Sequence, residues 1–166
     1  MANEPAATTI VVGIDGSPGS DEAVRWVAEH GPLLNARVTA VHVVSRVDLW
    51  DLAALQVDSA PGLEDRRKKA RGEWTEPLRL AGLRVNARIV RGDPAMELLR
   101  VGNERLADLI VIGAKNHTGV RDIVLGGTAH KVANHARRPV LLVPAPSRPS
   151  RRKRELPDTR QVRPLL

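Results

Sequence analysis

The chain has 166 residues, a length typical of one domain with a substantial hydrophobic core. Aromatic residues make up only 2% and cysteine is absent, which excludes disulfides, thiolate metal sites and thiol catalysis and makes base stacking hard to arrange. The formal net charge is +7, but seven basic against two acidic residues lie from Arg148 onward, so the rest of the chain is nearly neutral and the overall charge says little about partners.

The sequence also predicts where the protein is located and how the chain divides into segments. No apolar run approaches the length of a membrane-spanning helix, and the N-terminus lacks the basic start and long apolar stretch of a secretory signal. We therefore expect a soluble cytoplasmic protein with no membrane contact, with a flexible N-terminus over 1–7, one domain over 8–145 and a basic, Pro-containing, disordered tail over 146–166. The tail fits an arm for nucleic acid or another anionic partner, but a solubilising extension is the favoured interpretation.

The first half of the domain alternates strand and helix patterns. A β-branched strand over 8–14 ends in a turn signal at 15–17, and a helix follows that either Ser17 or Ser20 caps. A second strand covers 37–44, and a single charged helix is predicted over 63–81, with Trp74 packed on the sheet. The apolar face expected for the first helix consists of Ala23, Val24, Val27, Ala28 and then Leu34.

The second half repeats the alternation. A strand over 83–90 precedes Asp93, a candidate cap, and Pro94, a candidate first helical residue. The next strand, 108–112, is apolar throughout, as a strand covered on both faces should be. A helix over 128–136 and a short last strand over 139–144 follow. Met96, Leu99, Val101 and Leu106 are expected to continue as a helix after Pro94.

This alternation predicts the α/β class, with a doubly wound five-stranded parallel sheet and helices on both faces. Ligands of such sheets bind beyond the carboxyl ends of the strands, where the strand order reverses. Asp15 and Gly113 both follow strands at that edge, so they face each other if the first and fourth strands are neighbours.

Glycines near the fourth strand suggest a phosphate site, although both common nucleotide fingerprints are absent from the sequence. Gly113 follows the strand, and Gly126-Gly127-Thr128 opens a helix. A helix start offers unpaired N–H groups and the positive end of a dipole, and glycines let a ligand approach the backbone.

The order of several motifs gives a family resemblance over roughly 8–145. The motifs are Val11–Ser17, His42-Val43, Gly92–Pro94, Asp108–Gly113 and Pro139–Val143. In this order they resemble the universal stress proteins. The resemblance implies a Rossmann-like sheet in the order 3-2-1-4-5, a homodimer and, in many members, bound ATP or AMP.

The nucleotide-binding members carry G-x2-G-x9-G-[ST], which this chain keeps in part. Gly113 and Gly126 match, whereas Asn116 replaces the second glycine and Gly127 stands at the Ser/Thr position. Asn tolerates the left-handed conformation, but its side chain occupies space near the phosphates. A lost neutral hydrogen bond costs ~1 kcal/mol, roughly fivefold in affinity, so binding is weakened rather than abolished.

The resemblance also assigns a site. It places adenine and ribose at Ile14, Asp15 and Val43. It places the phosphates of ATP, with or without Mg²⁺, on Gly113, Gly126, Gly127 and Thr128. Ile112 and Asn116 complete the predicted nucleotide-binding set.

Alternatives remain open at single residues and for the whole chain. Asp15 fits an Asx turn as well as a nucleotide contact, and His42 fits a core histidine better than a catalytic base.

No catalytic base or metal set is evident, so an enzyme is the weakest of three hypotheses, with slow ATP hydrolysis at most. The others are a regulatory adenine-nucleotide-binding protein and a dimeric interaction module that binds no nucleotide. Dimerisation is expected through the last strand, Val140–Val143.

Overall fold

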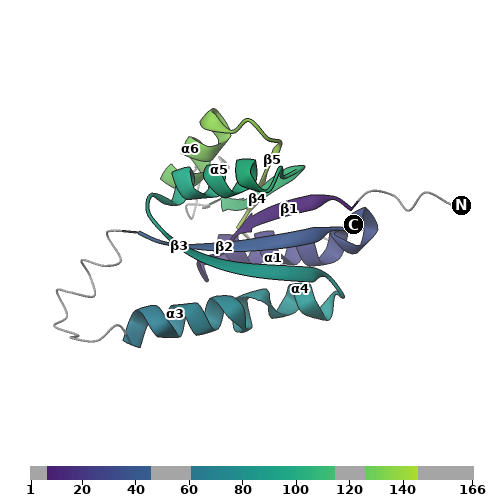
Figure 1. The fold of residues 1–166 in the computed structure, drawn as a ribbon, viewed down its shortest axis with the longest axis horizontal. Coiled ribbons are helices and arrows are strands. Elements are labelled where there is room, and N and C mark those ends of the chain that lie inside the picture. The colour runs from purple at the N-terminus through teal and green to yellow at the C-terminus, as the bar shows by residue number, and fades with distance from the viewer. Residues whose placement is uncertain (1–6, 46–60, 115–125, 146–166) are drawn as a thin grey trace, which may run out of the picture.

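The computed structural model describes residues 7–45, 61–114 and 126–145. Five parallel strands form one sheet in the order β3-β2-β1-β4-β5 (Figure 1). The strands are β1 (Thr9–Gly13), β2 (Arg37–Val44), β3 (Arg84–Arg91), β4 (Leu109–Ala114) and β5 (Val140–Pro144). The predicted fold class and strand order are therefore confirmed.

Helices cover both faces of the sheet. One face carries α1 with α3 and α4, and the other carries α5 and α6 (Figure 1). The helical segments are α1 (Pro18–His30), η1 (Pro32–Leu34), α3 (Pro61–Arg71), η2 (Glu73–Thr75), α4 (Glu76–Leu80), α5 (Pro94–Glu104) and α6 (Gly127–His135). None of the helices in the described residues is long and apolar enough to span a membrane.

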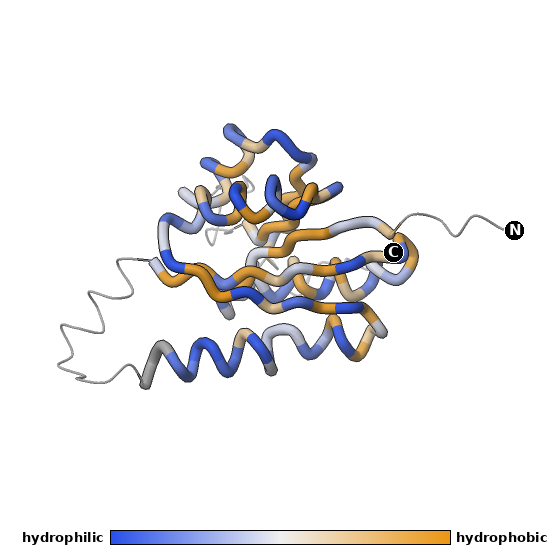
Figure 2. The backbone as a smooth tube through the Cα atoms, viewed as in Figure 1, coloured by the Kyte–Doolittle hydropathy of each residue, from blue (hydrophilic) through white to orange (hydrophobic). Residues whose placement is uncertain are grey.

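Two aliphatic cores lie on either side of β1, the central strand. Successive side chains of a strand point to opposite faces, so Ile10 and Val12 pack beneath α1 while Val11 packs beneath α5. All three side chains are fully buried. Figure 2 shows this as hydrophobic strands beneath helices whose outer faces are hydrophilic. The cores hold β1 and β4 side by side, which brings their carboxyl ends together.

Side-chain caps fix the starts of α1 and α5. The Ser17 hydroxyl accepts a hydrogen bond from the Ser20 backbone N–H at 3.3 Å, with Pro18 as the first helical residue. Ser17 is therefore the cap, and the Ser20 hydroxyl instead accepts from the Asp15 N–H at 3.1 Å. As predicted, Asp93 caps α5, accepting from the backbone N–H groups of Ala95 and Met96.

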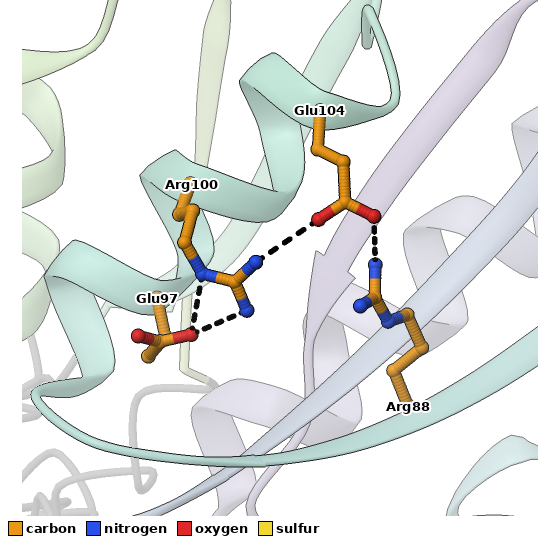
Figure 3. A network of polar contacts seen from close by, with 4 residues as sticks. All are labelled: Arg88, Glu97, Arg100 and Glu104. Atoms are coloured by element: carbon orange, nitrogen blue, oxygen red, sulfur yellow. Dashed lines mark hydrogen bonds and ion pairs between the residues drawn. The ribbon is translucent and has the colours of Figure 1, made fainter.

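An ion-pair network joins α5 to the edge strand β3 (Figure 3). Arg88 contacts Glu104 at 2.8 Å, and Glu104 contacts Arg100 at 3.0 Å. Arg100 also contacts Glu97 at 2.7 Å. The network links four charged side chains across two elements on the face opposite α1.

The single helix predicted over 63–81 is wrong. α3 ends at Arg71, Gly72 has a non-helical backbone (φ −114°, ψ −99°), and η2 and α4 follow. Pro77 has no N–H, so a continuous helix would lack one of its backbone hydrogen bonds at this point. The break places Trp74 in η2 instead of within a long helix.

Two predictions about the helices are wrong at their C-terminal ends. Leu34, expected on the apolar face of the first helix, lies in η1 after α1 has ended and is 39% exposed. Leu106, expected to be helical, lies beyond the end of α5 with a φ of 50° and is 66% exposed. Met96 lies within α5 as predicted and is 61% exposed. The buried residues of α5 are Ala95, Leu98, Leu99, Val101 and Gly102.

Candidate functional site

A cleft of about 580 Å³ opens at the carboxyl edge of the sheet. The ends of β1, β2 and β4 form its floor, the start of α6 lies on one side, and residues of α3 and η2 lie on the other. This volume is in the range of small-molecule sites. The chain adds β2 and β3 on one side of β1 and then β4 and β5 on the other, so the strand order reverses between β1 and β4. The cleft lies at this point, where doubly wound sheets bind ligands.

Hydrogen bonds fix the floor of the cleft at the end of β1. The Ile14 N–H donates to the Val41 carbonyl at 2.9 Å and so extends the pairing of β1 with β2. Asp15 Oδ1 accepts from the Ser17 N–H at 2.9 Å, which is the Asx-turn contact. The Asp15 side chain is nevertheless exposed and lines the cleft. Its turn role is shown, and its exposure is compatible with the ligand role as well.

Acidic groups gather near this turn. Burial raises the pKa of the Asp21 carboxyl, and the neighbouring Asp15 carboxylate raises it further. Between α5 and α6, the Lys131 ammonium donates to Asp93 Oδ2 at 3.0 Å and lowers the pKa of Asp93. This second contact ties the start of α5 to α6.

A close approach between two backbones explains Gly113. A Cβ atom at Gly113 would lie 2.1 Å from the Gly19 carbonyl carbon in α1. A Cβ at Gly19 would in turn lie 3.0 Å from the Ala114 carbonyl oxygen. Packing of α1 on β4 therefore accounts for this glycine, although Gly113 also lines the cleft.

No such packing cause is found for Gly127, the first residue of α6. Among the described residues, a Cβ at Gly127 would meet nothing within 4 Å. Gly126 before it has an ordinary φ of −58°. The first turn of α6 contains no acidic residue, so its positive dipole end is not neutralised from within the helix. Backbone N–H groups at this end are suited to an anionic ligand.

The structure brings most of the predicted site together. Asn116 lies outside the described residues. The others line the one cleft and are Ile14, Asp15, Val43, Ile112, Gly113, Gly126, Gly127 and Thr128.

Two ring side chains of the cleft were missed by the site prediction. The Trp74 indole covers Gly16, where a Cβ would lie 2.7 Å from Trp74 Cζ2 and where φ is +75°. His42 is only 2% exposed and its Nδ1 lies 2.9 Å from the Ile14 carbonyl oxygen, so it is a core histidine as expected. It is not the fully satisfied one that was expected, because among the described residues its Nε2 has no hydrogen-bond partner. It also lines the cleft. The local sequence around Trp74 gave no signal of this position, because the break in the predicted helix creates it.

Side chains of α3 complete the wall beside Trp74. They are Asp65, Arg66 and Lys69, and Lys69 contacts Asp65 at 3.3 Å. Within residues 7–45, 61–114 and 126–145, no three His, Cys, Asp or Glu side chains are grouped so that they could hold a metal ion.

The fold and the cleft define a Rossmann-like α/β domain with a small-molecule cleft at its switch point. Comparison with known families makes this specific: the model of the universal stress protein family matches residues 7–144, and the chain belongs to that family. The resemblance found in the sequence is thereby confirmed.

Relatives and solved structures agree with this assignment. Universal stress protein MJ0531 of Methanocaldococcus jannaschii is 30% identical over 149 residues, covering 84% of this chain and 83% of that protein. Universal stress protein Rv2623 of Mycobacterium tuberculosis is 28% identical over 145 residues, covering 83% of this chain and 46% of that protein. This chain thus spans about half the length of that mycobacterial relative.

Two solved structures illustrate the fold and its ligands. Hypothetical protein MJ0577 has a TM-score of 0.70 at 22% identity, covering 85% of this chain and 98% of its own, and shows the fold. A universal stress protein in complex with cAMP has a TM-score of 0.59 at 26% identity, covering 85% of this chain and 99% of its own. Nucleotide binding is therefore found among the structural neighbours.

Proposed function

We propose that this chain is a regulatory protein that binds an adenine nucleotide, ATP or AMP, at the carboxyl edge of its sheet. The observation that carries the proposal is the convergence of eight site residues, from β1, β2, β4 and α6, on a single cleft. The cAMP complex of a neighbour at 26% identity supports an adenine nucleotide as the ligand class.

Each end of the cleft suits a different part of such a ligand. Ile14 and Val43 offer apolar surface for the base, and Asp15 offers a carboxylate that can accept from ribose hydroxyls. Gly126 and Gly127 offer a helix start without side chains of their own, and Thr128 follows with a hydroxyl. ATP would enter either alone or as its Mg²⁺ complex, with its phosphates at α6.

Calorimetric titration of the full chain with ATP and AMP, with and without Mg²⁺, tests this function. We expect binding of at least one nucleotide. Gly126→Val should weaken ATP binding more than Asp15→Ala, because a branched side chain at the start of α6 blocks the approach of the phosphates. Equal affinity of Gly126→Val and the parent would place the ligand elsewhere, and no heat with any nucleotide would reject the proposal.

A second candidate function is a dimeric interaction module, and the position of β5 favours it. Among the described residues, β5 pairs only with β4, so one edge of an apolar strand is left for pairing with another chain. We propose that Val140–Val143 form the dimer contact, as the family resemblance implies.

Sedimentation and hydrogen exchange test the dimer. We expect a dimer mass at micromolar concentration, with amide protection of Val140–Val143 that falls on dilution. A monomer mass at those concentrations would contradict it. A dimer that binds no nucleotide would favour the second candidate function over the first.

A further inference from the structure

The end of α3 is capped by two side chains that follow it in the sequence. The last carbonyl groups of a helix have no partner within the helix, so other groups must satisfy them. The Thr75 hydroxyl lies 3.2 Å from the carbonyl oxygens of both Ala70 and Gly72, and Thr75 is fully buried. The Arg79 guanidinium donates to the carbonyls of Arg71 and Gly72. We call Thr75 and Arg79 the α3 cap.

The α3 cap holds the break in which Trp74 lies. Trp74 is in η2, between the end of α3 and Thr75, so the place of its backbone depends on how the break is fixed. Gly72 provides little restraint of its own, because glycine is the most flexible residue. On the far side of the break, Leu78 of α4 is fully buried in the core. The cap therefore joins an anchored α4 to α3 and sets the position of the indole between them.

The indole supports the floor of the ligand cleft. A Cβ at Gly16 would lie 2.7 Å from Trp74 Cζ2, so the ring lies directly over the Gly16 backbone. Gly16 belongs to the turn closed by Asp15, whose side chain lines the cleft. The indole also packs edge-on against His42, with ring centroids 5.1 Å apart at 65°, and lines the cleft itself.

We propose that Thr75 and Arg79 are positioning residues, which hold Trp74 against the turn at Asp15 and Gly16 and so keep the cleft preorganised for its ligand. This inference rests on the proposed function, since its consequence is measured as nucleotide affinity. Neither Thr75 nor Arg79 lines the cleft, so both act on a ligand only through Trp74. A site that is preorganised for only part of the time binds more weakly in proportion to that fraction.

Removing either member of the α3 cap should weaken binding of ATP and AMP. Arg79→Met removes the guanidinium from an exposed side chain, and Thr75→Val removes the hydroxyl at similar volume. We expect each to lower the affinity for both nucleotides by up to about fivefold, the factor that corresponds to one lost hydrogen bond. Titrations are made well below the Tm of every variant, so that loss of folded protein does not contribute.

Conservative variants and a matched control separate the cap from a general change in charge. Arg79→Lys and Thr75→Ser retain a donor and should restore most of the affinity. Arg67→Met is the control: Arg67 lies on α3 and pairs with Glu64 at 3.5 Å, but it contacts neither the break nor the cleft. Its affinity for both nucleotides should equal that of the parent.

A double-mutant cycle tests whether Arg79 acts through the indole. Trp74→Ala should itself weaken nucleotide binding. Adding Arg79→Met to Trp74→Ala should then change the affinity no further, because the side chain that Arg79 positions is gone.

Fluorine spectra of the chain labelled with 5-fluorotryptophan report the indole directly and without a ligand. The Trp74 resonance is assigned by its loss in Trp74→Phe. In Arg79→Met it should shift toward the position of free 5-fluorotryptophan, whereas in Arg67→Met it should stay in place.

The outcomes distinguish this inference from the proposed function. If the parent binds ATP or AMP and folded Arg79→Met binds equally well, or if the Trp74 resonance of Arg79→Met does not move, the positioning role is rejected while nucleotide binding stands. An effect of Arg79→Met that persists in Trp74→Ala rejects it as well. If neither nucleotide binds the parent, the proposed function itself fails, and this inference fails with it.

Discussion

At Gly113 an added methyl group would collide with the backbone of α1, whereas at Gly127 it would meet no atom of the described residues within 4 Å. At Gly113 the cause of the glycine therefore lies within the fold. At Gly127 no packing within the described residues requires glycine, and the approach of a ligand stays a prediction there.

We predict that Gly113→Ala destabilises the fold. A Cβ atom 2.1 Å from the Gly19 carbonyl carbon forces α1 away from β4, and overpacking of this kind costs about 1–3 kcal/mol. Urea unfolding of the variant and the parent measures the difference. A midpoint equal to the parent's would show that the two backbones do not approach each other closely.

Gly127→Ala is the matched change with the opposite expected result. Alanine is favoured over glycine in a helix by up to about 1 kcal/mol, so stability should be unchanged or slightly higher. ATP affinity should fall severalfold if the phosphates approach this backbone. A stable variant with unaltered ATP affinity would remove Gly127 from the proposed site.

The sequence predicted which residues lie together at one sheet edge better than it predicted the causes of individual residues. Eight of the proposed residues share one cleft because they follow strands or open a helix at one sheet edge, which the alternation of elements reveals. Trp74 and His42 were not assigned to the cleft, because their positions depend on contacts between segments distant in the chain. His42 reaches Ile14, which precedes it by 28 residues.

Among the elements, α5 begins at a cap that also joins it to α6. Asp93 accepts from two backbone N–H groups of its own helix and from the Lys131 ammonium. Its pKa is lowered first by the hydrogen bond from Lys131 and then by the bond from the Met96 N–H. A carboxylate with a lowered pKa in the folded state stabilises the fold above its unfolded pKa of about 3.9.

We predict that this stabilisation is lost as the pH falls through the folded pKa of Asp93, which lies below the unfolded value. Asp93→Asn keeps a capping side chain without the charge, so its stability should depend less on pH below about 4 than that of the parent. Asp93→Ala should lose about 0.5–2 kcal/mol at pH 7 because the cap is gone. Unfolding free energies at several pH values measure both, and parallel pH profiles of Asp93→Asn and the parent would contradict the first.

The apolar faces of the helices were predicted less accurately than their existence. Met96 and Leu106 have the hydrophobicity of core residues but lie outside the buried face of α5. Leu98, which was not singled out from the sequence, is buried and lines the cleft. When apolar residues are frequent, their helical spacing is compatible with more than one buried face. Packing against the sheet then determines which face is buried.

For the whole molecule, we propose that residues 146–166 are dispensable for folding. The segment is polar, Pro-interrupted and without a periodic apolar face. Deleting residues 147–166 should leave the Tm within about 5 °C of that of the full chain and ATP affinity unchanged. A larger fall in Tm would show that these residues pack on the domain.

The position of β1 in the sheet has a consequence for the time course of folding. β1 pairs on one side with β2, which follows it closely, and on the other with β4, where Ile10 lies opposite Leu109. During synthesis, the edge of β1 that pairs with β4 therefore stays unpaired until about a hundred further residues have been made. Pairing of this kind is slow because a long loop must close first. The cleft, which needs both Asp15 and Gly113, forms only after that closure, so a chaperone that recognises unpaired strands would meet β1 before any ligand does.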